Sequence, residues 1–122
     1  DELIGHGHTN SDRQGDLNED AERELLRSCR DRIRKASGKA ALGWLSPWIA
    51  ESFATPDLLA ETGYKYTLNW CHDDQPTKFR TTKGTLWSIP YPQELNDIPM
   101  IVARRMDGRD FADLIVDNFD EM

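Results

Sequence analysis

Residues 40–70 read AALGWLSPWIAESFATPDLLAETGYKYTLNW, and this stretch decides the fold class. It holds two apolar segments, residues 40–45 and 64–70, on either side of a short helical segment at residues 57–62. Thr55 stands where an N-cap is expected, proline follows it, and Gly63 ends the helical segment, which are the usual signals of helix boundaries. The stretch therefore predicts a strand, a helix and a strand in succession, the repeating unit of a parallel sheet.

The second of these strands alternates in polarity. Tyr64, Tyr66, Leu68 and Trp70 fall on one face, and lysine, threonine and asparagine fall on the other, as in a strand with one buried side. We interpret Tyr64 and Tyr66 as core residues.

The segment upstream predicts a longer helix. Asn18 is a suitable N-cap, acidic residues occupy the first turn, basic residues occupy the last, and Gly38 is a plausible terminator. Apolar side chains recur every three or four residues along it: Ala21, Leu25, Cys29, Ile33 and Ala36.

Further elements extend this alternation of strands and helices. Residues 2–6 resemble the end of a buried strand, a hairpin across Lys83-Gly84 joins residues 78–82 to 85–90, and a last helix runs from Asp110 to Phe119. The order predicts an α/β fold with a parallel sheet, whose chemistry lies at the carboxyl ends of the strands.

Composition limits the classes of function. The 122 residues fit one domain and carry a net charge of −7, which argues against a nucleic-acid or membrane partner bound by bulk charge. The chain opens on a polar Asp-Glu-Leu-Ile without an initiator methionine or a visible signal peptide, and we expect a piece of a longer, cytoplasmic protein. Cys29 and Cys71 are expected to be reduced thiols, with a single bridge between them as the alternative.

Polar residues follow the predicted strands. His6 and His8 would share one face if the first strand continued, a geometry that suits a divalent metal; the alternative is a pair of hydrogen-bonding loop histidines. Asp73 and Asp74 follow the strand at residues 64–70, where a carboxylate beside tryptophan could act as an acid or base. The alternative for this pair is a solvated turn before proline.

Aromatic and loop residues complete the candidate site. Trp48 and Trp70 lie near strand ends and could stack on a flat or ring-shaped ligand. Glu94 and Asn96 follow two prolines, which stiffen the loop that presents them; a purely structural loop is equally consistent with this pattern.

Together these segments resemble the polysaccharide deacetylase (NodB-homology) superfamily, and within it the branch of metal-independent allantoinases and cyclic imide hydrolases. The resemblance covers nearly all of the chain and rests on five motifs in order: Glu2-Leu-Ile-Gly-His6-Gly7-x-Thr9-Asn10-Ser11, Gly43-Trp44-Leu45-Ser46-Pro47, Thr55-Pro56-Asp57-Leu58-Leu59-x-Glu61-x-Gly63-Tyr64, Asp73-Asp74-Gln75-Pro76 and Pro90-Tyr91-Pro92-x-Glu94-Leu95-Asn96-Asp97. It implies a distorted (β/α) barrel, of which residues 1–122 would form a single, partial catalytic domain. The family's first and last motifs, which carry the usual catalytic base and acid, are absent from these residues.

The resemblance also implies roles for individual residues. His6 matches the first histidine of the family's His-Ser/Thr-x-x-His motif, but Asn10 stands in place of the second, which weakens a zinc site and agrees with the metal-free branch. Leu45 stands where the family has an arginine that orients the catalytic carboxylate. Asp73 and Asp74 match the acidic fourth motif.

We therefore expect a hydrolase of non-peptide C–N bonds in small cyclic amides, imides or ureides. Asp73 and Asp74 would be catalytic, His6 would bind the substrate carbonyl or a metal, and the pocket would be shaped by Asn10, Trp48, Trp70, Glu94 and Asn96. The cofactor would be none or one divalent metal such as zinc, the ligand a small molecule, and the protein a homo-oligomer. A metal-dependent carbohydrate deacetylase and a non-catalytic binding module are the alternatives.

Overall fold

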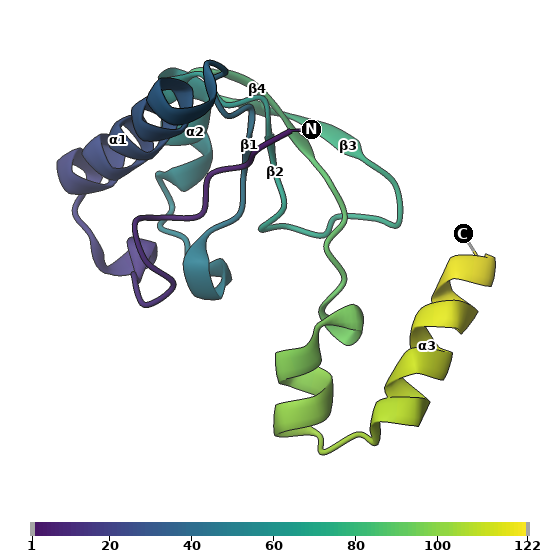
Figure 1. Cartoon of the computed structure of the whole chain (residues 1–122). Coiled ribbons are helices and arrows are strands. Elements are labelled where there is room, and N and C mark those ends of the chain that lie inside the picture. The colour runs from purple at the N-terminus through teal and green to yellow at the C-terminus, as the bar shows by residue number, and fades with distance from the viewer. Residues whose placement is uncertain (1, 122) are drawn as a thin grey trace. The chain divides into compact units, whose positions relative to one another are not determined.

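The computed structural model describes residues 2–121. The chain divides into two compact units, Asp1–Pro90 and Tyr91–Met122. The first unit contains a four-stranded sheet in the order β1-β2-β4-β3, with α1 and α2 beside it (Figure 1). The second unit is helical. Within residues 2–121, no helix combines the length and apolarity needed to cross a bilayer.

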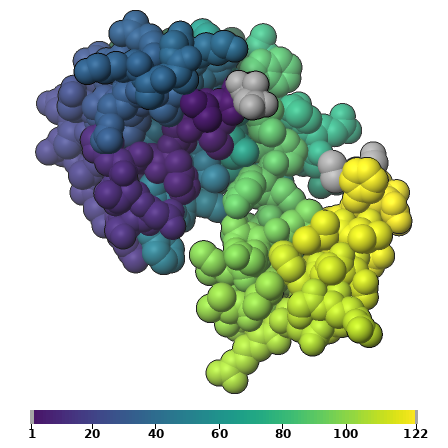
Figure 2. Space-filling view, viewed as in Figure 1, coloured from purple at the N-terminus to yellow at the C-terminus, as the bar shows by residue number. Residues whose placement is uncertain are grey.

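Helix α1 (Glu19–Ser37) has the boundaries that the sequence predicts. The Asn18 side chain accepts a hydrogen bond from the Ala21 amide (2.9 Å), and Gly38 ends the helix in a left-handed conformation with φ of 77°. Its buried face includes Leu25, Leu26 and Cys29. In the space-filling view, the N-terminal residues, in purple, lie against the blue surface formed by residues that follow them in the first unit (Figure 2).

The sheet is mixed, as the predicted hairpin requires. Strands β1 (Gly43–Trp44), β2 (Tyr66–Thr67) and β4 (Gly84–Ser88) are parallel, and β3 (Thr77–Thr81) is antiparallel to β4. The strand predicted at residues 2–6 is reduced to a parallel bridge between Gly5 and Trp44, and those predicted at residues 40–45 and 64–70 keep only two residues each. The predicted parallel α/β arrangement is confirmed, with shorter strands.

The two faces of the sheet differ in burial. Trp44, Thr67 and Ser88 share one register row and are buried, whereas Trp87 in the neighbouring row is 44% exposed. The buried row belongs to the side of the core formed with α1 and α2 (Thr55–Thr62), where Trp44 meets Tyr64 edge to face at 5.4 Å. This face is stabilised by burial of apolar surface.

Two details of the prediction were wrong here. Tyr64 is in the core as expected, but Tyr66 is only half-buried and Trp70 is exposed, while Thr67 from the opposite face is fully buried. Side chains alternate between the two faces of a sheet only within a strand. Because β2 has two residues, the alternation predicted for residues 64–70 does not extend beyond it. The N-cap of α2 is Ala54, and Thr55 lies inside the helix.

The second unit contains the 3-10 turn Gln93–Leu95, a π-helical segment at Ile98–Ala103 and helix α3 (Gly108–Glu121). Helix α3 confirms the predicted last helix and extends it by two residues at each end. Met100 is buried within this unit, whereas Ile115 and Phe119 on α3 are exposed.

Candidate functional site

The carboxyl ends of the parallel strands meet at one edge of the sheet, which we call the carboxyl edge. The register aligns Gly5 with Trp44, and Trp44 with Thr67, so the residues that follow each of them gather there. The Ser46 amide donates to the Asn69 side chain across this edge (2.8 Å). The structure therefore brings His6 together with the residues that follow β1 and β2.

His6 is fixed at the carboxyl edge by both of its ring nitrogens. Its Nδ1 donates to the Leu45 carbonyl oxygen (2.7 Å), and its Nε2 lies 3.0 Å from the Asn10 side-chain oxygen. Both residues are exposed, so the pair is open to a ligand. The first and second positions of the family's histidine motif are thus neighbours in space.

The loop that carries this pair is organised by Asp12. Its carboxylate accepts from the His8 and Thr9 amides (2.9 and 3.1 Å) and from the Thr9 hydroxyl (2.8 Å). These hydrogen bonds lower the pKa of Asp12 below its ordinary value, and the bond from the Thr9 hydroxyl has the largest effect. The His8 ring points to α1 instead, where Nε2 lies 2.8 Å from the Ser28 hydroxyl.

The donor set at the carboxyl edge does not fit a zinc ion. It offers one imidazole and one amide, and a side-chain amide is a poor zinc ligand. Across residues 2–121 no three histidine, cysteine or acidic side chains are grouped closely enough to hold a metal. By itself, the His6–Asn10 pair is therefore not a zinc site.

A buried polar network lies next to the carboxyl edge and was missed by sequence reasoning. Gln14 is fully buried, donates to Glu22 (2.7 Å) and accepts from the Trp44 indole (3.0 Å) and the Ser46 hydroxyl (3.0 Å). We define the Glu22–Glu51 network as the hydrogen-bonded side chains of Gln14, Glu22, Trp44, Ser46, Glu51, Ser52, Thr55, Asn69 and Trp70.

Glu51 is the member of this network that reaches a pocket. Its two carboxylate oxygens accept from the Asn69 amide and the Trp70 indole. Burial raises the pKa of Glu51 above its ordinary value, the two hydrogen bonds oppose that rise, and the charge of Glu22 adds to it. A carboxylate that reaches a pocket and whose pKa is raised by burial is a candidate functional group.

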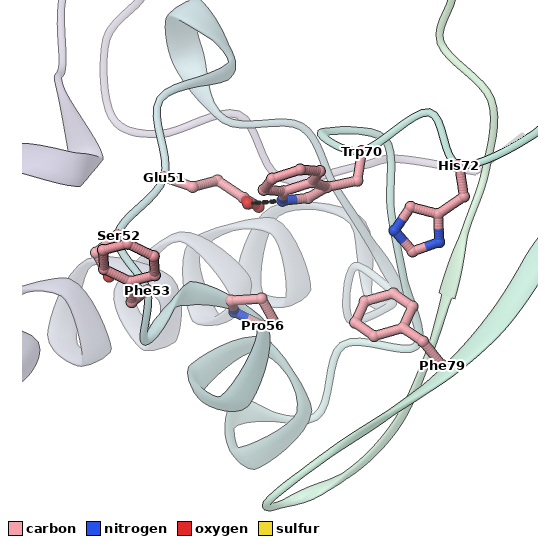
Figure 3. A pocket seen from close by; sticks show the side chains of 7 residues that line it. All are labelled: Glu51, Ser52, Phe53, Pro56, Trp70, His72 and Phe79. Atoms are coloured by element: carbon pink, nitrogen blue, oxygen red, sulfur yellow. Dashed lines mark hydrogen bonds between the residues drawn. The ribbon is translucent and has the colours of Figure 1, made fainter.

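The pocket has a volume of about 260 Å³ and is lined by Glu51, Ser52, Phe53, Pro56, Trp70, His72 and Phe79. The indole, imidazole and phenyl rings lie around a common space, with the carboxylate at the indole edge (Figure 3). Trp70, expected to contact a ligand, is part of this lining.

The two predicted catalytic carboxylates lie elsewhere. Asp73 and Asp74 occupy the exposed loop between β2 and β3, and the Asp74 amide donates to the Asp73 carboxylate (2.8 Å). Neither lines the pocket, where their neighbour His72 does. Their catalytic role stays a prediction.

Trp48 is presented by an unusual backbone. Trp48 and Ile49 both have positive φ, 60° and 52°, which is rare for residues other than glycine. The Trp48 ring is 62% exposed, and the Arg13 guanidinium lies 5.8 Å from its centroid. Trp48 is available to stack on a ligand at the carboxyl edge but does not line the pocket.

Glu94 and Asn96 lie in the second unit. Glu94 is exposed, and Asn96 donates to the Tyr91 hydroxyl (2.9 Å) and accepts from the Ile98 amide (3.1 Å). Asn96 therefore organises its own loop, and substrate contact by either residue stays a prediction.

Comparison with known proteins identifies a curated relative. A peptidoglycan deacetylase of Helicobacter pylori (strain ATCC 700392 / 26695) is 32% identical over 97 residues, or 79% of this chain. The chain spans about a third of that protein, 32% of its length. No protein-family model matches the chain.

Solved structures share the fold over more of the chain. Puue allantoinase matches 98% of it with a TM-score of 0.82 and 26% identity, over 40% of that protein. A polysaccharide deacetylase-type protein from Pseudomonas aeruginosa PAO1 matches 98% with a TM-score of 0.79 and 24% identity, over 40% of its own length. Another from Mycobacterium smegmatis matches 80% with a TM-score of 0.70 and 27% identity, over 34%. With its fold and sequence pointing the same way, this chain belongs to the polysaccharide deacetylase superfamily, of whose barrel it forms a part.

Proposed function

We propose that the protein containing this chain hydrolyses a carbon–nitrogen bond other than a peptide bond in a small cyclic amide, imide or ureide. The observation that carries the proposal is the His6–Asn10 pair at the carboxyl edge, with Nε2 and Oδ1 3.0 Å apart. An amide in place of a second imidazole favours hydrogen bonding to a substrate over zinc binding. The likeness to an allantoinase, with a TM-score of 0.82, supports the same class.

In this proposal, the residues near the carboxyl edge have separate roles in hydrolysis. His6 and Asn10 bind the substrate carbonyl, because their side chains are exposed and held in place by Leu45 and the Asp12 loop. Asp73 and Asp74 orient the attacking water. Trp48 and Trp70, which are exposed on the first unit, stack on the ring of the substrate. Fixed hydrogen-bond donors aimed at the oxygen that gains charge lower the barrier of acyl transfer.

The second candidate is carbohydrate deacetylation, favoured by the 32% identity to a peptidoglycan deacetylase. The experiment assays the full-length protein on allantoin, a cyclic imide and an N-acetylated sugar, each with and without a chelator. Turnover of a cyclic substrate that survives chelation and falls in His6→Ala and Asn10→Ala supports the first proposal. Chelator-sensitive release of acetate from the sugar favours the second, and no turnover on any substrate favours a binding module.

We also propose a homo-oligomer or a larger assembly, with no nucleic-acid or membrane partner, in the cytoplasm. Exposed apolar side chains on the first unit, among them Leu3, Leu42 and Trp87, support association. The net charge of −7 argues against polyanionic partners. The free thiols of Cys29 and Cys71 suit a reducing compartment.

A further inference from the structure

The pocket beside the carboxyl edge has a carboxylate in its wall, that of Glu51, which forms no ion pair with a lysine or arginine among the described residues. The ion pairs of the described residues include neither Glu51 nor Glu22. Glu51 accepts from the neutral side chains of Asn69 and Trp70. The seven residues that line the pocket include no lysine or arginine. The hydrogen bonds that Glu51 accepts therefore come from neutral groups only, and an ionised carboxylate that is partly buried without a cationic partner is costly.

Aromatic rings form much of the remaining wall. The Trp70 and His72 ring centroids are 6.4 Å apart, and those of His72 and Phe79 are 5.4 Å apart in an edge-to-face arrangement. Figure 3 shows these three rings around one space, with Pro56 across from them. Trp70 lines the pocket and is 54% exposed, so a large part of its side chain is accessible to a ligand.

The hydrogen bond between Trp70 and Glu51 links the two features. The indole Nε1–H points at the carboxylate, which places negative charge at the positive edge of the ring and makes its π-face more attractive to a cation. Cations bind best over tryptophan among the aromatic side chains, and desolvation strengthens the interaction.

We propose that this pocket binds the cationic head group of a small organic molecule, an alkylated ammonium, between the faces of Trp70 and Phe79 with Glu51 as its counter-ion. The volume of about 260 Å³ lies below that of pockets for drug-sized ligands and suits a head group. A neutral ligand would fill the same space and leave the carboxylate without a partner. The inference goes beyond the hydrolysis proposed above and does not depend on it.

The test compares two ligands of the same shape. Choline and its neutral isostere, in which carbon replaces the nitrogen, are titrated separately into the full-length, ¹⁵N-labelled protein. The observable is the indole N–H resonance of Trp70, assigned from its loss in Trp70→Phe. We expect choline to shift this resonance and to bind about tenfold more tightly than the isostere, which corresponds to ~1.4 kcal/mol. Equal binding of the two ligands, or no shift with either, would overturn the proposal.

Matched charge variants separate the pocket from the overall acidity of the protein. Glu51→Gln and Glu24→Gln each remove one negative charge, but Glu24 is exposed on α1 and does not line the pocket. We expect Glu51→Gln to weaken choline binding about tenfold and Glu24→Gln to leave it unchanged. Equal effects of the two would refute the role of Glu51. If Glu51→Gln fails to fold, Trp70→Leu is tested instead. We expect this variant to lose the preference for choline over the neutral isostere, and a retained preference would refute the proposed pocket.

Discussion

The imidazole of His6 and the amide of Asn10, four residues apart on a loop, are hydrogen-bond neighbours at 3.0 Å between Nε2 and Oδ1. On a helix this spacing would follow from the turn itself. Here it depends on the left-handed Gly7 (φ 73°) and on the Asp12 carboxylate, which bind the loop back on itself. The pair is therefore only as rigid as this loop.

Replacing Asn10 by histidine tests the cofactor assignment. We expect the protein as purified to carry little zinc and Asn10→His to gain affinity for Zn²⁺ or Co²⁺ by tenfold or more, because two imidazoles would then face each other. Elemental analysis and Co²⁺ absorption titration measure this. His6→Ala combined with Asn10→His should cancel the gain. Stoichiometric zinc in the unmodified protein, lost in His6→Ala, would contradict the assignment.

The buried carboxylate of Glu22 is predicted to be structural. Removing it in Glu22→Ala orphans donors on Gln14, Ser52 and Thr55, and we expect the free energy of unfolding to fall by about 1–3 kcal/mol. Urea titration followed by circular dichroism measures the change. Glu24→Ala, an exposed position two residues along α1, should change it by less than ~0.5 kcal/mol. Equal losses in the two variants would show that the network contributes nothing specific.

The two thiols are predicted to react at very different rates. Burial raises the pKa of Cys29 to about 11, which suppresses the reactive thiolate, whereas Cys71 is exposed. Titration with Ellman's reagent in native buffer should show one fast and one slow thiol, and the fast phase should disappear in Cys71→Ser. A fast phase that persists in that variant would place the reactive thiol at Cys29.

The pH dependence of stability should carry the signature of Glu51. Its pKa is raised in the folded state, chiefly by burial, above an ordinary value of 4.5. The folded protein then holds a proton that the unfolded chain releases, so the free energy of unfolding decreases as the pH rises from 4.5 through the raised pKa. Glu51→Gln should flatten this decrease in urea titrations across that range.

Asp12 provides the opposite sign as a control. Its pKa is lowered, mainly by the Thr9 hydroxyl, so it contributes stability above its ordinary pKa of 3.8 that is lost as the pH falls. Asp12→Asn should therefore reduce the acid-side loss of stability and leave the Glu51 decrease in place. Identical pH profiles of the unmodified protein and both variants would refute both assignments.

The isolated 122-residue chain is predicted to self-associate. Trp87 and Leu42 are 44% and 42% exposed in the first unit, and Ile115 and Phe119 are exposed on α3. Large exposed apolar patches are rare on soluble monomers. Sedimentation velocity at low micromolar concentration measures this. A single monomer of 14.0 kDa with a cooperative thermal transition would rule association out.

Much of the fold follows from local signals in the sequence. Asn18 and Gly38 delimit α1 as predicted, and the predicted hairpin forms, with its turn at Thr82-Lys83 rather than at Lys83-Gly84. Both signals are readable because capping and turn chemistry act within a few residues. Strand length was predicted poorly, since β1 and β2 keep only the residues that pair with neighbours distant in sequence.

The candidate site divides in the same way. The sequence linked His6 and Asn10 only through the resemblance, as the two histidine positions of the family's motif. The sequence did not reveal Gln14, Glu22 and Glu51 as members of a polar network. Whether a polar side chain is buried depends on the helices and loops that pack around it, and no local sequence pattern shows this. The sequence pointed to the pocket only through Trp70, which was predicted near the end of a strand. No sequence pattern indicated that Glu51 would reach the same pocket.

The left-handed backbone at Trp48 and Ile49 makes this turn a target for engineering thermal stability. A non-glycine residue in this region costs roughly 1–2 kcal/mol, and a β-branched one such as Ile49 is especially unfavourable there. Glycine or asparagine would relieve that cost. Glycine or asparagine at Ile49 is therefore expected to raise the free energy of unfolding, whereas the same change at Trp48 would also remove the exposed indole.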